Sequence, residues 1–500
     1  MAFNSGKFLL FFPCAVIVYF ILPKKLKSIW LLACSYCFYM AWNPIYILLL
    51  MFSTFVTYMS GIVLDKQVKS GVQAKYRKMT VAASVVINLG MLAYYKYTGF
   101  AFEILNRFLT GIIYTEPLMG GVVPDIVLPV GISFFTFQAL SYTIDVYRGE
   151  VDAEHNILTY ALFVSFFPQL VAGPIERSRN LLVQVRNIGK KRLWDYEGII
   201  RGLMLMLWGF FMKVVIADRL SAITDPVFND QAAYGASMRI LAISCFAIQI
   251  YCDFAGYSTI AIGAARVMGL NLMENFNTPF LARNVKDFWN RWHISMSSWF
   301  RDYLYFPLGG SRCSKKRYYF NLFITFLASG LWHGAAAKYI VWGALNGILQ
   351  IVNRIWQPYW KRLLSSLRIK ENGPVKYLEM IISFITFTLT LIVFRANSLK
   401  LAVEYALHIF TRPDYRQFIT ERTYRALASD RDMIINLIAI FILLVVGVIR
   451  KNKGKMIDEY LTGKNYPVRV AVMMFLLFFI LLFGQYGEDV YTQPFVYFQF

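Results

Sequence analysis

The chain has 500 residues, of which 58% are hydrophobic, and its mean hydropathy is +0.49. A soluble protein of this length would not carry so large an apolar fraction, so the composition excludes an ordinary soluble domain. The formal net charge is +22. Basic residues gather in short loops between apolar runs, which is typical of cytoplasmic loops of membrane proteins and argues against nucleic-acid binding.

Apolar runs of about 20 residues, long enough to cross a bilayer as helices, recur along the whole chain. We therefore predict an all-α polytopic membrane protein with about 11–13 membrane helices, including re-entrant or interfacial segments, around a central cavity. The run 122–145 contains Pro124, Pro129 and Gly131 and is expected to include irregular backbone. The predicted spans are 8–22, 29–41, 45–63, 79–96, 122–145, 157–173, 199–217, 238–262, 318–334, 336–352, 376–394, 433–449 and 468–484.

The basic residues also predict the orientation in the plasma or inner membrane. Lysines follow the first apolar run, the reverse of a cleavable signal peptide, so the N-terminus is expected outside. Basic loops at 64–78, 175–192, 312–317 and 450–455 are expected in the cytoplasm. The final span then places the tail 485–500 outside. We treat 1–500 as one membrane domain, in which 274–317 is too charged to span and is expected to be interfacial or re-entrant.

Cysteines and histidines give no metal-site pattern. The six cysteines fall mostly in apolar runs, and the pair Cys34 and Cys37 lacks a second pair of ligands. We expect no metal and no bound cofactor.

His333, one of only four histidines, lies in a run of apolar or small residues from 326 to 337. An ionisable side chain at membrane depth is costly and by default indicates a functional site. Burial should keep the imidazole neutral, the form that accepts a proton. Gly330 and Gly334 flank it and would let backbone or substrate approach closely. The alternative is a neutral core histidine bonded to a neighbouring carbonyl.

Two long motifs contain His293 and His333, and they resemble the signature of the membrane-bound O-acyltransferase superfamily. They read DFWNRWHISMSSWFRDYLYFPLGG at 287–310 and GLWHG at 330–334. Supporting matches are YCDFAGYS at 251–258, PVGISFFTFQ at 129–138 and VAGPI at 171–175. The resemblance covers nearly the whole chain. It is greatest to the bacterial alginate O-acetylation branch, followed by the D-alanyl-teichoic-acid transfer branch.

The resemblance implies catalytic roles for both histidines. His333 would be the base, and His293 would position the acyl donor or stabilise developing charge, unless it is an interfacial histidine. Further candidates for binding donor or substrate are Trp332, Asn290, Arg291, Asp253 and Arg301. Asp253 could orient a histidine or pair with an arginine. The arginines, with Arg312, could hold donor phosphates or contact lipid head groups.

The C-terminus carries the pattern F-x-Y-x-x-F, formed by Phe495, Tyr497 and Phe500. It resembles the C-terminal tyrosine motif of bacterial systems that move acyl groups across the membrane. The resemblance implies that Tyr497 is an acyl acceptor, activated by a base because a neutral phenol is a weak nucleophile. The alternative is an aromatic anchor at the membrane interface.

Together these features predict a membrane O-acyltransferase. The resemblance implies that an acetyl group leaves a cytoplasmic donor, acetyl-CoA or an acyl-carrier thioester, and crosses the membrane through Tyr497. A partner outside the membrane, an SGNH-like acetyltransferase or related envelope protein, would then O-acetylate a cell-surface polysaccharide. The alternatives are D-alanyl transfer to teichoic acid, a proton-coupled transporter in the same lipid environment, and a non-catalytic scaffold.

Overall fold

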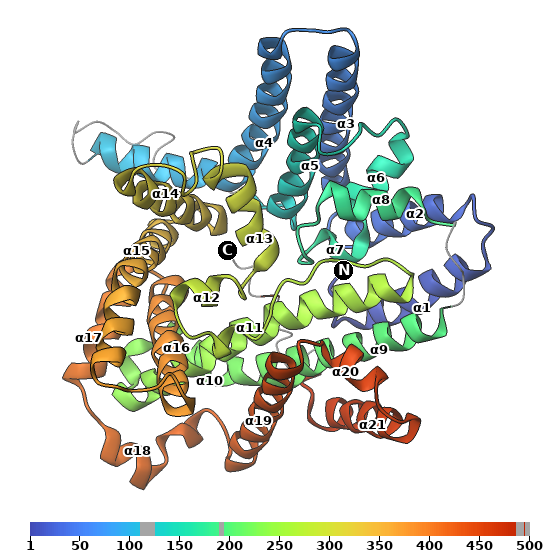
Figure 1. Ribbon diagram of the computed structural model, residues 1–500. Helices are drawn as coiled ribbons and strands as arrows, with labels where there is room; N and C mark the ends of the chain where they lie inside the picture. Colours follow the sequence, from blue (N-terminus) through green and yellow to red (C-terminus); the bar gives the residue numbers. More distant parts are fainter. Residues whose placement is uncertain (111–125, 190–194, 487–494, 496–500) are drawn as a thin grey trace. The chain divides into compact units, whose positions relative to one another are not determined.

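The computed structural model describes residues 1–110, 126–189, 195–486 and 495. Every regular element in these ranges is a helix, which confirms the predicted all-α class (Figure 1). Seven of the described helical segments are long and apolar enough to cross a membrane, and the shorter apolar helix Gly6–Ile21 adds to them. The chain divides into two compact units.

The first unit comprises residues 1–200, 264–273 and 334–336. Its long helices α3 and α4 are joined by a hydrogen bond in which the hydroxyl of Ser53 donates to Oδ1 of Asn88 at 2.6 Å. Its elements are α1 (Gly6–Ile21), α2 (Lys27–Met40), η1 (Pro44–Tyr46), α3 (Ile47–Lys69), α4 (Ala74–Phe108), α5 (Ile132–Arg148), α6 (Ile157–Ser165), α7 (Phe167–Leu170), η4 (Ser178–Leu182) and α8 (Val183–Arg186).

Two of the predicted spans in this unit are interrupted. Helix α5 begins only after Gly131, whose φ of 78° is left-handed, so the described part of the run 122–145 is irregular before Ile132, as expected. The run 157–173 was predicted as one span, but α6 ends at Ser165 and a second short helix starts at Phe167. Pro168 lacks the N–H that a continuous helix would need.

The second unit comprises residues 201–263, 274–333 and 337–500. It contains all the predicted site residues that the structure describes. Its elements are α9 (Tyr196–Phe210, whose first turn belongs to the first unit), η5 (Phe211–Ala217), α10 (Asp218–Asn229), η6 (Gln231–Ala233), α11 (Ala236–Val267, whose last turn belongs to the first unit), η7 (Pro279–Leu281), α12 (Val285–Trp289), α13 (Ile294–Phe300), η8 (Arg301–Tyr305), α14 (Lys315–His333), α15 (Ala337–Ser366), α16 (Gly373–Arg395), α17 (Leu399–Thr411), α18 (Tyr415–Glu421), η9 (Thr423–Ala426), α19 (Asp430–Lys453), α20 (Ile457–Thr462) and α21 (Tyr466–Phe483).

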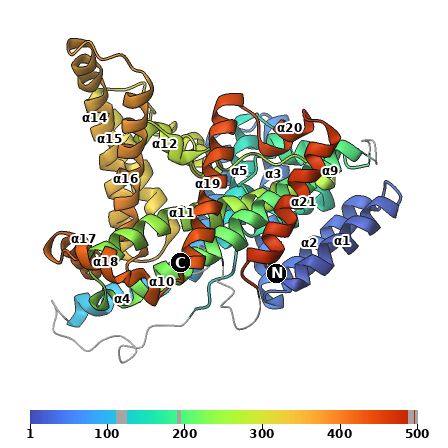
Figure 2. The same ribbon diagram turned by 90° about the horizontal axis from the view of Figure 1, so that it is seen from below.

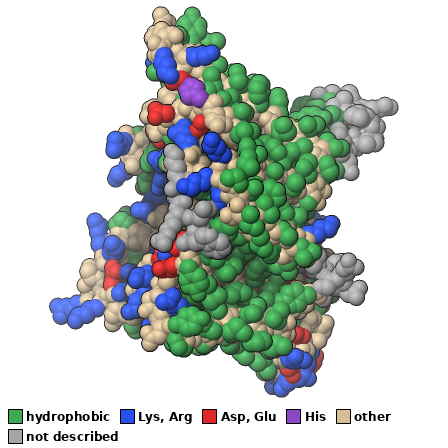
Figure 3. Space-filling view, turned by 90° about the vertical axis from the view of Figure 1, so that its right-hand side faces the viewer, with side chains coloured by type: hydrophobic (Ala, Val, Ile, Leu, Met, Phe, Trp, Pro, Cys, Tyr) green, Lys and Arg blue, Asp and Glu red, His purple; other side chains and the backbone are tan. Residues whose placement is uncertain are grey.

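Before α14 begins at Lys315, the segment 274–317 forms only short helices, namely η7, α12, α13 and η8. None of them is long enough to span a bilayer, and the interfacial or re-entrant placement stays a prediction. Hydrophobic side chains cover much of the face shown in Figure 3, and lysines and arginines gather mostly beside them. The multi-pass membrane prediction is therefore confirmed.

Helices α14, α15 and α16 are neighbours (Figure 2), and α14 meets α15 at two glycines. A Cβ built on Gly330 would collide with the carbonyl oxygen of Tyr339 and lie 2.8 Å from the Cα of Gly343. A Cβ on Gly343 would lie 2.6 Å from the carbonyl oxygen of Phe326. Small residues let membrane helices approach backbone to backbone, and here they do so one turn before His333.

Replacing Gly330 by alanine should therefore destabilise the protein. The added methyl group has no space, and overpacking of this kind typically costs about 1–3 kcal/mol. The free energy of unfolding, measured in detergent, should fall accordingly. Gly90→Ala on α4 is the matched control, because a Cβ there meets no atom within 4 Å. Equal stability of the two variants would contradict the close contact.

Candidate active site

His333 is the last residue of α14 and is buried, with 4% of its surface exposed. The close approach of α14 to α15 brings the indole of Trp342 against its ring, with centroids 5.0 Å apart and the rings nearly perpendicular. Phe394 on α16 contacts the imidazole in the same edge-on manner at 5.7 Å. Aromatic side chains from two further helices therefore surround the predicted base.

His293 lies between α12 and α13 and is fully buried. Its φ of 46° is left-handed. This conformation is uncommon for residues other than glycine, and residues that adopt it often occur at functional sites. The imidazole Nδ1 lies 3.1 Å from Oδ1 of Asn275, and Phe254 of α11 contacts the ring edge-on at 4.6 Å. Burial lowers the pKa of His293 well below its ordinary value, and the nearby His333 lowers it further.

The side chain of Trp332 contacts both histidines. Its ring centroid is 5.1 Å from that of His333 and 5.9 Å from that of His293. The sequence motif therefore brings its two histidines together against one indole, although 40 positions separate them in the chain. The arrangement places two buried imidazoles within electrostatic reach of each other.

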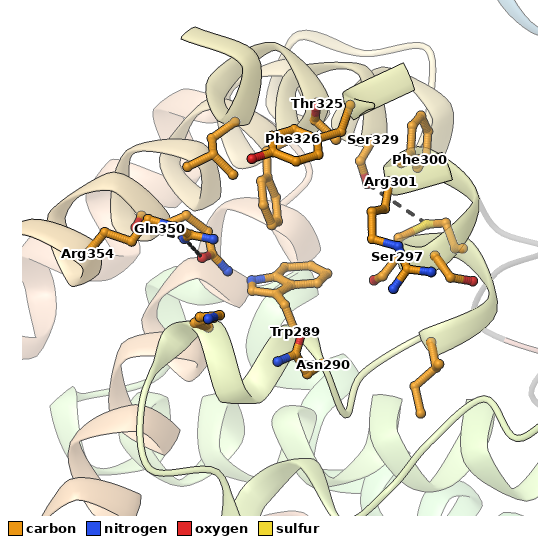
Figure 4. A pocket seen from close by; sticks show the side chains of 16 residues that line it. Trp289, Asn290, Ser297, Phe300, Arg301, Thr325, Phe326, Ser329, Gln350 and Arg354 are labelled. Atoms are coloured by element: carbon orange, nitrogen blue, oxygen red, sulfur yellow. Dashed lines mark hydrogen bonds between the residues drawn. The ribbon is translucent and has the colours of Figure 1, made fainter. Parts of the chain in front are cut away.

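A cavity of about 310 Å³ is lined by residues close in sequence to this pair, although neither histidine is itself a lining residue (Figure 4). Trp289 and Phe326 form much of its apolar wall, and Met296 and Ser329 also line it. Ser329 lies one helical turn before His333, and Ile294, another lining residue, follows His293 directly. A largely apolar cavity with a few polar groups is typical of a small-molecule site.

Cationic side chains also line this cavity. Figure 4 shows Arg301 on one side of Trp289 and Arg354 with Gln350 on the other, and Lys286 is a third cationic lining residue. The Nη1 group of Arg354 donates to Oε1 of Gln350 at 2.5 Å, while Arg301 forms an ion pair with Asp302 at 2.8 Å and remains more than half exposed. Positively charged side chains along the lining of a cavity suit a phosphate-bearing ligand.

Of the five predicted binding residues, two line the cavity, whereas Arg291, Trp332 and Asp253 do not. Asn290 and Arg301 are lining residues. Arg291 is instead held against its own loop by an ion pair with Asp287 at 2.7 Å and a hydrogen bond to the hydroxyl of Thr278 at 3.3 Å. It is not among the residues that line the cavity.

The sequence left open whether Asp253 orients a histidine or pairs with an arginine, and the structure places a lysine beside it. Lys213 in η5 forms ion pairs with Asp253 at 2.6 Å and with Asp218 at 2.8 Å. All three side chains are at most 7% exposed. Because Lys213 lies in η5 and Asp253 in α11, their ion pair joins these two elements. Removing one partner would leave an uncompensated buried charge and would be strongly destabilising.

The C-terminal tail reaches this site through Phe495, the one described residue after 486. Phe495 is 3% exposed, and its ring centroid lies 5.5 Å from that of Phe254 and 5.0 Å from that of Tyr257. Phe254 is the residue whose ring contacts His293. Tyr497 and Phe500 lie outside the described residues.

Several residues of the site were not found from the sequence. Asn275, Trp342 and Phe394 contact the histidines, and Lys286 and Arg354 line the cavity. Trp342 and Phe394 belong to apolar helices in which any aromatic residue could be a core residue. No cluster of three metal-ligating side chains occurs in the described ranges.

The chain is similar to several known proteins. Residues 34–394 match the family described as MBOAT, membrane-bound O-acyltransferase family. The chain is 37% identical over 403 residues to the probable alginate O-acetylase AlgI of Pseudomonas aeruginosa, covering 80% of this chain and 73% of the relative. It is 32% identical over 434 residues to the peptidoglycan O-acetyltransferase of Helicobacter pylori, covering 81% and 79%.

A more distant relative is the teichoic acid D-alanyltransferase of Bacillus subtilis, 29% identical over 244 residues, which cover 47% of this chain and 60% of the relative. The family match extends over most of the chain and includes both histidine motifs. The chain therefore belongs to the membrane-bound O-acyltransferase family and is a polytopic membrane acyltransferase.

Proposed function

We propose that this enzyme transfers an acetyl group from a cytoplasmic thioester across the membrane for O-acetylation of a polysaccharide outside the cell. The observation that carries the proposal is the pair of buried histidines beside a cavity with cationic lining residues. Relatives named as O-acetylases or O-acetyltransferases cover about four fifths of this chain, whereas the D-alanyltransferase of Bacillus subtilis covers less than half. These coverages favour acetyl over D-alanyl transfer.

The donor would enter from the basic side of the protein. Lys286, Arg301 and Arg354 would hold the phosphates of acetyl-CoA or of an acyl-carrier thioester, and the apolar walls would receive the thioester arm. No bound cofactor is needed for this reaction. The thioester carbonyl would then lie in the part of the cavity next to Ile294 and Ser329, close to both histidines.

The acceptor in this proposal is the phenol of Tyr497. Phe495 packs beside Phe254, whose ring contacts His293. Tyr497 follows two residues later, and two residues of extended chain span at most about 7 Å, so Tyr497 would stay close to this site. His333 would take the phenolic proton as the oxygen attacks the acetyl carbonyl, and would return that proton to the thiolate when the carbon–sulfur bond breaks. The products are an acetylated tyrosine and a free thiol.

The acetyl group would leave on the outer side of the plasma or inner membrane. There a partner, an SGNH-like acetyltransferase or related envelope protein, would accept it from Tyr497 and pass it to a polysaccharide hydroxyl. This step requires both termini outside and the basic loops in the cytoplasm.

Incubation of the purified protein with labelled acetyl-CoA or an acetyl-carrier thioester should leave an acetyl group on the C-terminal peptide. His333→Ala should slow this labelling by about 10²–10⁴-fold, the usual contribution of a positioned base. Tyr497→Phe should abolish it, because the accepting oxygen is absent. Mass analysis of the intact protein and its peptides provides the measurement.

His155→Ala is the matched control for the histidine, since His155 is 62% exposed and pairs with Asp65. It should label at the wild-type rate. A folded wild-type protein that takes no label from either donor would overturn the relay and bring direct transfer or transport to the front. Label that persists in Tyr497→Phe would assign the acceptor elsewhere.

The cationic residues give a second, independent test. Arg301→Gln should raise the donor concentration needed for half-maximal labelling about tenfold, because a hydrogen bond to a charged group contributes about 1.5 kcal/mol or more. The maximal rate should change little, since Arg301 would bind the donor away from the reacting atoms. Arg317→Gln, an exposed residue outside the cavity lining, is the control. Equal effects of the two changes would argue for general surface charge instead.

A further inference from the structure

Asn275 holds three successive residues of the segment that contains His293. Its backbone carbonyl accepts a hydrogen bond from the N–H of Ile294 at 2.9 Å. Its side-chain Oδ1 accepts from both the backbone N–H of Ser295 at 3.2 Å and the hydroxyl of Ser295 at 2.9 Å. The same Oδ1 lies 3.1 Å from Nδ1 of His293. One asparagine therefore fixes the left-handed turn at the start of α13.

These bonds determine which way the amide of Asn275 faces. A backbone N–H can only donate, so the atom that it meets must be the amide oxygen and not the amide nitrogen. The amide nitrogen supports the same orientation, because Nδ2 of Asn275 lies 3.1 Å from the hydroxyl oxygen of Ser258, which can accept its hydrogen bond. A flipped amide would place a donor against the N–H of Ser295 and lose this bond.

The orientation of the amide in turn determines where the proton on His293 lies. Because Oδ1 is an acceptor, Nδ1 of His293 must be the donor in the bond between them. Burial and the proximity of His333 keep this imidazole neutral, and a neutral imidazole carries a single proton. The proton is therefore on Nδ1, and Nε2 carries the lone pair.

We propose that Asn275 is a positioning residue that fixes His293 as the Nδ1-protonated tautomer, so that Nε2 acts as an acceptor in the reaction. The role in the reaction rests on the proposed acetyl transfer, whereas the tautomer does not. Neutral His293 then cannot donate a hydrogen bond from Nε2 to a developing oxyanion. It instead orients a hydroxyl or thiol by accepting a hydrogen bond from it, while His333 on the same tryptophan acts as the base.

Nitrogen NMR of protein labelled with [15N]histidine tests the tautomer directly, because the chain has only four histidines. The signals missing from His293→Gln belong to His293. At neutral pH they should show a protonated Nδ1 and an unprotonated Nε2. A proton on Nε2, or comparable amounts of the two tautomers, would overturn the proposal. No acyl donor is needed, so the result is independent of whether acetyl transfer occurs.

Two substitutions then test the positioning role. Asn275→Asp keeps an oxygen facing Nδ1 and adds a negative charge, so it should preserve the tautomer and raise the pKa of His293. Asn275→Leu removes the acceptor and should leave the two tautomers mixed. Ser258→Ala removes the bond to Nδ2 of Asn275 but leaves Oδ1 facing His293, so the tautomer should stay as in the wild type.

The pH dependence of C-terminal labelling links the tautomer to the reaction. If neutral His293 is required, lowering the pH should abolish labelling by protonating this imidazole. Because Asn275→Asp raises the pKa of His293, its labelling should be lost at a higher pH than that of the wild type, and it should return when the pH is raised again. Asn275→Leu should label at least tenfold more slowly at every pH. An unchanged pH profile in Asn275→Asp, with the NMR titration of His293 shifted, would overturn its role in the reaction. Absence of labelling in the wild type would count against the acetyl relay alone.

Discussion

A polar group buried in a membrane protein has to find its partners within the protein, because hydrocarbon offers none. This constraint accounts for the hydrogen bonds around His293. His293 and His333 are both nearly inaccessible, and the surrounding aromatic rings keep water away from them. The hydrogen bond that His293 donates to Asn275 and the close contact of α14 with α15 are the means by which these imidazoles are held.

The two remaining features of the site serve opposite ends of the proposed reaction. The cavity beside Trp289 has cationic side chains and would receive a charged donor. Phe495 packs against Phe254 and Tyr257 of α11, and Phe254 also contacts His293. Lys213 connects that helix to η5 by its ion pair with Asp253. Asp253, one of the predicted residues, thus helps to hold the helix against which Phe495 packs.

Much of this could be predicted from the sequence, for physical reasons that also explain what was missed. His333 is conspicuous because an ionisable residue stands out in an apolar helix, and the long motifs pointed to Trp332 and His293. Charge alone could not separate Arg301, which lines the cavity, from Arg291, which is bound within its own loop. The role of Asn275 was invisible because its bonds cross about 20 residues that contain the short helices η7 and α12, so no single helical or strand periodicity relates the partners.

The left-handed backbone at residue 293 restricts which side chains this position can accept, before any chemistry is considered. Most residues pay about 1–2 kcal/mol for that conformation, and β-branched residues are the most disfavoured, whereas glycine, asparagine and aspartate adopt it readily. Among these, asparagine also offers an amide that can exchange hydrogen bonds in a dry site. Asparagine is therefore the replacement for this histidine that the backbone tolerates with a side chain still able to form hydrogen bonds.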